Sequence, residues 1–97
     1  MWLLRTDEAA EPGVVFRVLP GNIKTIGRAT GADFIVDAAL VSRVHCRLTA
    51  GASALEMVDL GSTNGTFVNG ERVDRASLKD GDRLGVGRVD LIVTRTA

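Results

Sequence analysis

Three short polar segments of the chain carry the side chains that could do chemistry: 27–28 (Gly-Arg), 42–45 (Ser-Arg-Val-His) and 61–66 (Gly-Ser-Thr-Asn-Gly-Thr). Guanidinium groups, hydroxyls and the backbone N–H groups of tight turns are all hydrogen-bond donors, and such donors bind phosphate or carboxylate when they converge. Each segment by itself is typical of an ordinary surface turn. Together they predict an anion site, provided that the fold brings them to one place.

Other kinds of chemistry find less support in the sequence. Ser42, His45 and Asp59 are the residue types of a hydrolase triad, but the chain has no Gly-x-Ser-x-Gly elbow and only one histidine. His45 and Cys46 are neighbours, which on a strand point to opposite faces and cannot share a metal ion. The glycines of 85–87 are not followed by the helix that a dinucleotide-binding motif requires. We therefore predict no enzyme, no metal site and no cofactor.

The composition of the chain indicates which classes of partner and which cellular location to expect. The 97 residues include 12 basic and 12 acidic side chains, so the formal net charge is zero and a nucleic-acid partner, which favours a basic excess, is not expected. No apolar run approaches the roughly 20 residues that cross a bilayer, and no secretory signal opens the chain. These observations predict an intracellular protein, cytoplasmic with a nuclear location not excluded, and no membrane contact.

Turn signals divide the chain into runs of four to eight residues, a spacing typical of β-structure. The Asn69-Gly70 pair predicts a tight hairpin turn, because both residues tolerate positive φ angles. Residues 37–43 are too short and too rich in Val and Ser for a helix, so a loop or single turn is expected there. The predicted strands are 2–5, 14–19, 22–26, 34–36, 45–49, 55–59, 66–68, 72–73, 83–86 and 89–94.

Many short strands without a helical crossover predict an all-β fold, an antiparallel sandwich or barrel, as a single domain over residues 1–97. The domain would be either free-standing or the N-terminal module of a longer protein. One cysteine can form no internal disulfide, so packing and hydrogen bonds must stabilise it. The predicted core consists of Val15, Ile26, Phe34, Leu48, Val58, Phe67, Leu84, Leu91 and Val93.

The order and wording of the three polar segments resemble the forkhead-associated (FHA) domain. The resemblance extends from Gly-Arg at 27–28 through Ser-Arg-Val-His at 42–45 to Asp-Leu-Gly-Ser-Thr-Asn-Gly-Thr-Phe-Val-Asn-Gly at 59–70, and the segment 78–84 also looks like a family element. It implies a two-sheet β-sandwich that binds phosphothreonine peptides through loops at one end, without catalysis. The implied partner is a protein phosphorylated on threonine by a Ser/Thr kinase.

The resemblance also implies roles for individual residues. Arg28 and Ser42 match the family's phosphate-contacting positions, and Thr63 matches a loop threonine that faces the phosphate. Asn64 matches the asparagine that holds the peptide backbone. Arg43 follows the motif serine, where the family uses polar or basic residues near the ligand. No motif position departs from the family pattern, so an intact phosphate pocket is expected.

Three further residues match positions that the family uses to build the loops: Gly27, His45 and Gly65. The imidazole is expected to satisfy backbone groups beneath the loops, and Cys46 is expected to be an ordinary buried strand residue. The apolar Leu40 and Val41 are expected to border the peptide, so no strong demand for an acidic residue after the phosphothreonine is predicted.

A second hypothesis assigns the chain to a different class, an assembly module that pairs with itself or another domain without phosphate. This hypothesis is based on the moderate apolar content and on the long alternating last strand, 89–94; the contact would be made by a sheet face or by an exposed strand edge. A monomer with at most weak self-association is the first expectation.

Overall fold

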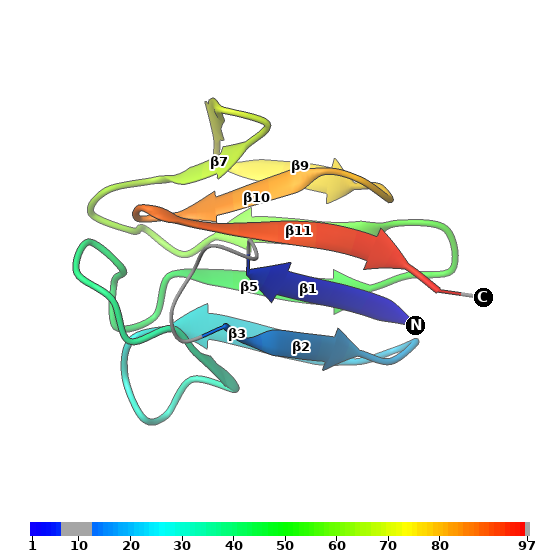
Figure 1. Ribbon diagram of the computed structural model, residues 1–97, viewed down its shortest axis with the longest axis horizontal. Coiled ribbons are helices and arrows are strands. Elements are labelled where there is room, and N and C mark those ends of the chain that lie inside the picture. Colours follow the sequence, from blue (N-terminus) through cyan, green and yellow to red (C-terminus); the bar gives the residue numbers. More distant parts are fainter. Residues whose placement is uncertain (7–12, 97) are drawn as a thin grey trace.

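The computed structural model describes residues 1–6 and 13–96, and this part of the chain forms two stacked β-sheets without a helix. Figure 1 shows the two layers, with the strands of both running roughly along the long axis. The predicted all-β sandwich is confirmed. No helix long and apolar enough to cross a membrane occurs in the described ranges.

The larger sheet has six antiparallel strands in the spatial order β2-β1-β11-β10-β7-β8. Every described pair in it is antiparallel, and the chain termini lie together at one end of the sandwich (Figure 1). Its strands are β1 (Trp2–Thr6), β2 (Val15–Val18), β7 (Thr66–Val68), β8 (Glu71–Val73), β10 (Arg83–Val86) and β11 (Val89–Arg95).

The smaller sheet has the spatial order β4-β3-β5-β6-β9. One of its pairs, β3–β4, is parallel, which corrects the expectation of a wholly antiparallel sandwich. The Asp33 carboxylate accepts hydrogen bonds from the N–H and hydroxyl of Thr25, so the loop after β3 returns along that strand before β4 begins. The strands are β3 (Ile23–Gly27), β4 (Phe34–Ile35), β5 (Cys46–Ala50), β6 (Leu55–Asp59) and β9 (Arg75–Leu78).

Strand β9 was not predicted from the sequence. Its residues Arg-Ala-Ser-Leu are poor strand formers, and only pairing with β6 makes the segment extended. Leu78 is fully buried, and the Ser77 hydroxyl donates to the Glu56 carboxylate across the pair. Tertiary contacts therefore override local propensity here.

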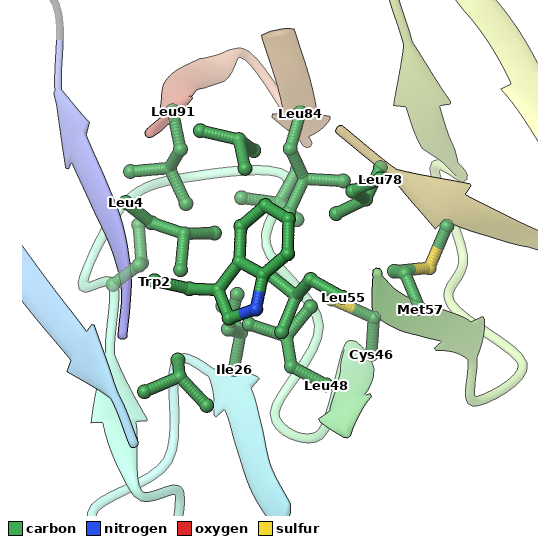
Figure 2. Packing of buried hydrophobic residues seen from close by; sticks show 14 of the residues in the cluster. Trp2, Leu4, Ile26, Cys46, Leu48, Leu55, Met57, Leu78, Leu84 and Leu91 are labelled. Carbon is green, nitrogen blue, oxygen red and sulfur yellow. The ribbon is translucent and has the colours of Figure 1, made fainter. Parts of the chain in front are cut away.

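The hydrophobic core lies between the two sheets and includes the Trp2 indole. Figure 2 shows this ring packed among leucines of both sheets. Of the predicted core residues, the five that are fully buried are Ile26, Leu48, Leu84, Leu91 and Val93. Cys46 is also fully buried, as expected.

The other four predicted core residues lie differently. Val15 is 58% exposed, because Val18 of the same strand takes the inward side. Val58 and Phe67 are half-buried, because other residues of their strands point into the core. Phe34 packs at the margin of the core, where its ring stacks on that of Phe16 with 4.5 Å between the ring centroids. Alternation fixes which residues share a face but not which face is inside when both carry apolar side chains.

The predicted hairpin is confirmed, since Asn69 and Gly70 have φ angles of 52° and 86° between the paired strands β7 and β8. Residues 36–45 are a loop, which includes the expected loop at 37–43; the predicted strands 34–36 and 45–49 therefore end one residue earlier and begin one residue later than expected. This loop 36–45, the loop 60–65 and the β10–β11 turn gather at the end of the sandwich away from the termini (Figure 1).

Candidate anion-binding groove

A groove of about 860 Å³ lies at the loop end, between loop 36–45 and loop 60–65. Of the five residues predicted to contact the ligand, Ser42 is half-buried and the other four are exposed. One carboxylate, that of Asp37, also lines the groove. All five predicted contact residues line this one groove: Arg28, Ser42, Arg43, Thr63 and Asn64.

Arg28 lines the groove and is held in place by loop 36–45. Its backbone N–H donates to the Ser42 carbonyl at 2.9 Å, and its side-chain Nε donates to the Val41 carbonyl at 3.1 Å. The two terminal amino groups of the guanidinium make no hydrogen bond or ion pair within the described residues. The side chain is therefore oriented by one donor while its fork remains available to an anion.

Ser42 and Thr63 link the two loops. The Thr63 backbone N–H donates to Ser42 Oγ at 3.0 Å. This bond uses an acceptor lone pair of the hydroxyl and leaves its O–H free to donate. A second hydroxyl, on the exposed Thr63, lines the same groove. The pair thus offers two hydroxyl donors beside the Arg28 guanidinium.

Asn64 is anchored at the opposite loop. Its side-chain Nδ2 donates to the Leu40 carbonyl at 3.1 Å. Its Oδ1 and its second N–H have no hydrogen-bonding partner in the described residues, so the amide can both accept from and donate to an extended peptide. Arg43 lines the groove with a guanidinium that likewise makes no ion pair among those residues.

His45 joins the loops from below and is fully buried. Its Nδ1 accepts from the Ser42 backbone N–H at 3.0 Å, which assigns the ring proton to Nε2, and Nε2 donates to the Gly65 carbonyl at 2.9 Å. Both ring nitrogens bond backbone groups, and among residues 1–6 and 13–96 no side chain hydrogen-bonds to the ring. The imidazole therefore acts as a connector between backbone groups of two loops.

Asp59 organises loop 60–65 and was not singled out as a loop residue from the sequence. Its carboxylate accepts from the hydroxyls of Ser62 and Thr66, both at 2.6 Å, and from the N–H groups of Gly61 and Ser62, both at 3.1 Å. Partial burial raises the pKa of Asp59, but these hydrogen bonds outweigh it and hold the pKa below its usual range. The signal in the sequence is Asp-Leu-Gly-Ser, an Asx-turn pattern.

Gly27 allows β3 to touch loop 36–45. A Cβ on Gly27 would lie 2.1 Å from the Arg43 carbonyl oxygen and 2.8 Å from its carbon, far inside contact distance. Only glycine fits, because the obstructing atoms are backbone. The close approach carries two hydrogen bonds, from Arg28 N to the Ser42 carbonyl and from Ala29 N to the Arg43 carbonyl.

A second, smaller groove of about 530 Å³ lies at the other end of the sandwich, near both termini. Its arginine, Arg95, donates from its guanidinium to the Ala52 carbonyl at 3.0 Å and lies 5.7 Å from the centre of the Trp2 ring. This guanidinium is occupied by contacts within the chain.

Comparison with known proteins agrees with this architecture. Residues 24–87 match the FHA domain family. The chain is 43% identical over 81 residues to the ABC transporter ATP-binding/permease protein Rv1747 of Mycobacterium tuberculosis, an alignment that covers 84% of this chain and 9% of that protein. The chain spans less than half the length of the curated relatives it matches.

Two solved structures are similar over nearly the whole chain. The FHA domain of FhaA, solved in complex with the intracellular domain of Rv3910, is 32% identical with a TM-score of 0.86, over 96% of this chain and 99% of that one. A domain solved for an analysis of phosphothreonine-dependent FHA domain interactions is 31% identical with a TM-score of 0.84, over 99% and 97% of the two chains. The chain belongs to the FHA domain family.

Proposed function

We propose that this domain binds proteins phosphorylated on threonine, with the phosphate held by Arg28, Ser42 and Thr63 and the peptide backbone held by Asn64. The observation that carries the proposal is the convergence of these side chains in one groove, with the Arg28 fork unoccupied within the described residues. Arg43 adds a second positive charge at the rim, and Gly27, His45 and Gly65 shape the loops.

The chemistry of the groove suits a phosphate. Phosphothreonine carries a charge of about −1.5 to −2 at pH 7 and three acceptor oxygens, which a guanidinium and two hydroxyls can satisfy. A related FHA domain was solved for its phosphothreonine-dependent interactions, and EmbR of Mycobacterium tuberculosis was solved with a phosphopeptide. Donors already fixed by hydrogen bonds need little ordering when the ligand arrives.

The proposed role requires no catalysis. The Ser42 hydroxyl accepts from the Thr63 N–H, and the Asp59 carboxylate accepts from Ser62 and Thr66, while both nitrogens of His45 bond backbone groups. The three side chains therefore do not form the arrangement of a hydrolase triad. We infer an intracellular binding module whose partner is the substrate of a Ser/Thr kinase.

The alternative, phosphate-independent assembly, loses one of its two grounds, the free edge of the last strand. Strand β11 pairs with β1 on one side and β10 on the other, so it lies inside the sheet and not at its edge. Sedimentation that finds a concentration-independent monomer would support the phosphopeptide role, whereas a stable dimer unaffected by phosphopeptide would favour assembly.

Isothermal calorimetry tests the proposal directly. A degenerate phosphothreonine peptide pool should bind with about micromolar affinity, near −8 kcal/mol. The unphosphorylated pool should not bind, and a phosphoserine pool reports how far the methyl group of threonine matters. Binding should weaken as pH falls from 7 to 5, because the second phosphate pKa is about 6. Equal binding of the phosphorylated and unphosphorylated pools would refute the proposal.

A further inference from the structure

The β10–β11 turn touches loop 36–45 backbone to backbone. Gly87, in this turn, has a φ of +60°, and a Cβ on it would lie 2.8 Å from both the carbon and the oxygen of the Leu40 carbonyl and 3.1 Å from the Val41 nitrogen. Because these are backbone atoms, any side chain at Gly87 must displace the loop. Figure 1 shows the turn beside the loops at the same end of the sandwich.

The touched residue, Leu40, has an unusual conformation. Its φ is 73°, in the left-handed region that leucine rarely adopts. Strained backbone of this kind persists only when surrounding contacts hold it, and it is concentrated at functional sites. Three contacts hold it within the described residues. The Val41 N–H donates to the Ala38 carbonyl at 3.3 Å and closes the turn that contains Leu40, and two contacts from outside the loop reach the Leu40 carbonyl. The Asn64 side chain donates to the Leu40 carbonyl, and the Gly87 backbone packs against the same carbonyl.

We propose that the β10–β11 turn is a positioning element of the binding groove, in which Gly87 fixes the Leu40 carbonyl and that carbonyl orients the Asn64 amide toward the ligand. The inference rests on the proposed function in one respect, the role of Asn64 in holding the peptide. Gly87 does not line the groove, and it acts on the ligand through Leu40 and Asn64.

Breaking the contact between Gly87 and Leu40 should lower the affinity for the peptide. A methyl group at position 87 pushes the Leu40 carbonyl away from its present position, so the Asn64 amide loses its anchor. An unanchored amide must be ordered when the peptide binds. Ordering one polar side chain lowers affinity about 3- to 10-fold.

The chain offers a matched control for this substitution. Gly81, in the β9–β10 turn, has a φ of +90°, and a Cβ on it would meet nothing within 4 Å. Gly87→Ala and Gly81→Ala therefore carry the same kind of backbone strain, but only Gly87→Ala displaces Leu40. Calorimetry with one phosphothreonine peptide should find the Gly87→Ala affinity about 3- to 10-fold below wild type and the Gly81→Ala affinity within about twofold of it. Equal affinities of the two variants would overturn the proposal.

A double-mutant cycle with Asn64→Ala tests the route. If Gly87 acts through the Asn64 amide, then Gly87→Ala costs little once that amide is gone, within about twofold. A full additive loss in the Asn64→Ala background would overturn the route. A merely destabilising effect of Gly87→Ala lowers the unfolding midpoint but leaves the cycle additive, so the two explanations separate.

A third measurement needs neither a ligand nor a folded Gly87→Ala variant. In Asn64→Ala, ¹⁵N relaxation should show increased fast motion of the Leu40 amide relative to wild type, because the hydrogen bond from Asn64 to the Leu40 carbonyl is removed. Unchanged order at Leu40 would overturn the coupling. A wild-type domain that binds no phosphothreonine peptide would refute the proposed function, while this relaxation experiment still decides whether the contact restrains the loop.

Discussion

The two grooves at opposite ends of the sandwich each contain an arginine, but they use it differently. In the groove near the termini, the Arg95 guanidinium donates to the Ala52 carbonyl and stacks over the Trp2 ring. In the groove at the loop end, Arg28 is oriented through Nε alone, and its terminal amino groups have no partner within the described residues. Arg95 therefore stabilises contacts within the chain, whereas the terminal amino groups of Arg28 are available to bind a ligand.

The supports beneath the two grooves differ as well. The loop-end groove rests on a buried imidazole and on a carboxylate that accepts four hydrogen bonds, and it includes a leucine with positive φ. The other groove lies between chain termini and short turns, without a buried polar connector among its lining residues. Local strain and buried polar groups are costly, so their concentration at one end marks where a fixed geometry is needed.

The largest expected effect comes from removing the connector beneath the loop-end groove. His45→Ala leaves the Ser42 N–H and the Gly65 carbonyl without their partner and opens a cavity, which should lower the free energy of unfolding by about 2–4 kcal/mol. Urea unfolding followed by tryptophan fluorescence measures it. Arg95→Ala, at the other groove, should cost less than about 1 kcal/mol. Equal losses would remove the structural contrast between the two ends.

The next effect concerns affinity. Arg28→Ala should weaken phosphothreonine peptide binding about 10- to 150-fold, because hydrogen bonds to a charged group contribute about 1.5–3 kcal/mol. Arg95→Ala should leave the affinity unchanged, and Arg28→Lys should recover part of the loss by restoring the charge without the fork. The difference between the grooves would be contradicted by an Arg95→Ala loss as large as that of Arg28→Ala.

A smaller effect should appear in the acid dependence of stability. The folded-state pKa of Asp59 lies below the unfolded value of about 3.9, so its carboxylate stabilises the fold above that value. That contribution should be lost as pH falls through the folded-state pKa. Asp59→Asn should therefore reduce stability at pH 7 and flatten its decline below about pH 4. Urea titrations at several pH values measure it, and an unchanged acid limb in the variant would contradict the role of Asp59.

The last prediction concerns the reactivity of Cys46, which is fully buried at the start of β5, next to His45. Burial, with a smaller effect of the Asp59 charge, raises the pKa of the thiol to about 12. Since the thiolate is the reactive form, native protein should react with iodoacetamide at pH 8 far more slowly than protein unfolded in urea. Mass spectrometry measures both rates, and comparable rates would mean that the core opens readily around Cys46.

Local signals account for much of the fold, and the family resemblance predicted the residues of the groove, but neither predicted the individual contacts that hold distant segments together. The Asn69-Gly70 turn and the loop at 37–43 follow from residue type alone. Strand β9 could not be predicted, because its extended form depends on pairing with β6. Likewise, the face on which Val58 lies depends on how the sheets stack, which alternation within one strand leaves open.

The candidate site shows the same division. The five predicted contact residues came from the resemblance of the polar segments to the FHA family, and the structure brings them to one groove. The contact of Gly87 with Leu40 has no local signature, because a glycine in a hairpin turn usually serves the turn itself. It is visible only when the two segments are seen in space.

The central claim, that the loop-end groove and not the groove near the termini binds phosphothreonine, is tested most directly by ¹⁵N chemical-shift mapping. On addition of a phosphothreonine peptide, we predict the largest shifts at the backbone amides of Arg28, Ser42, Thr63 and Asn64, with little change at Trp2 and Arg95. The unphosphorylated peptide should shift neither set. Shifts concentrated around Trp2 and Arg95, or shifts of equal size with both peptides, would contradict the account.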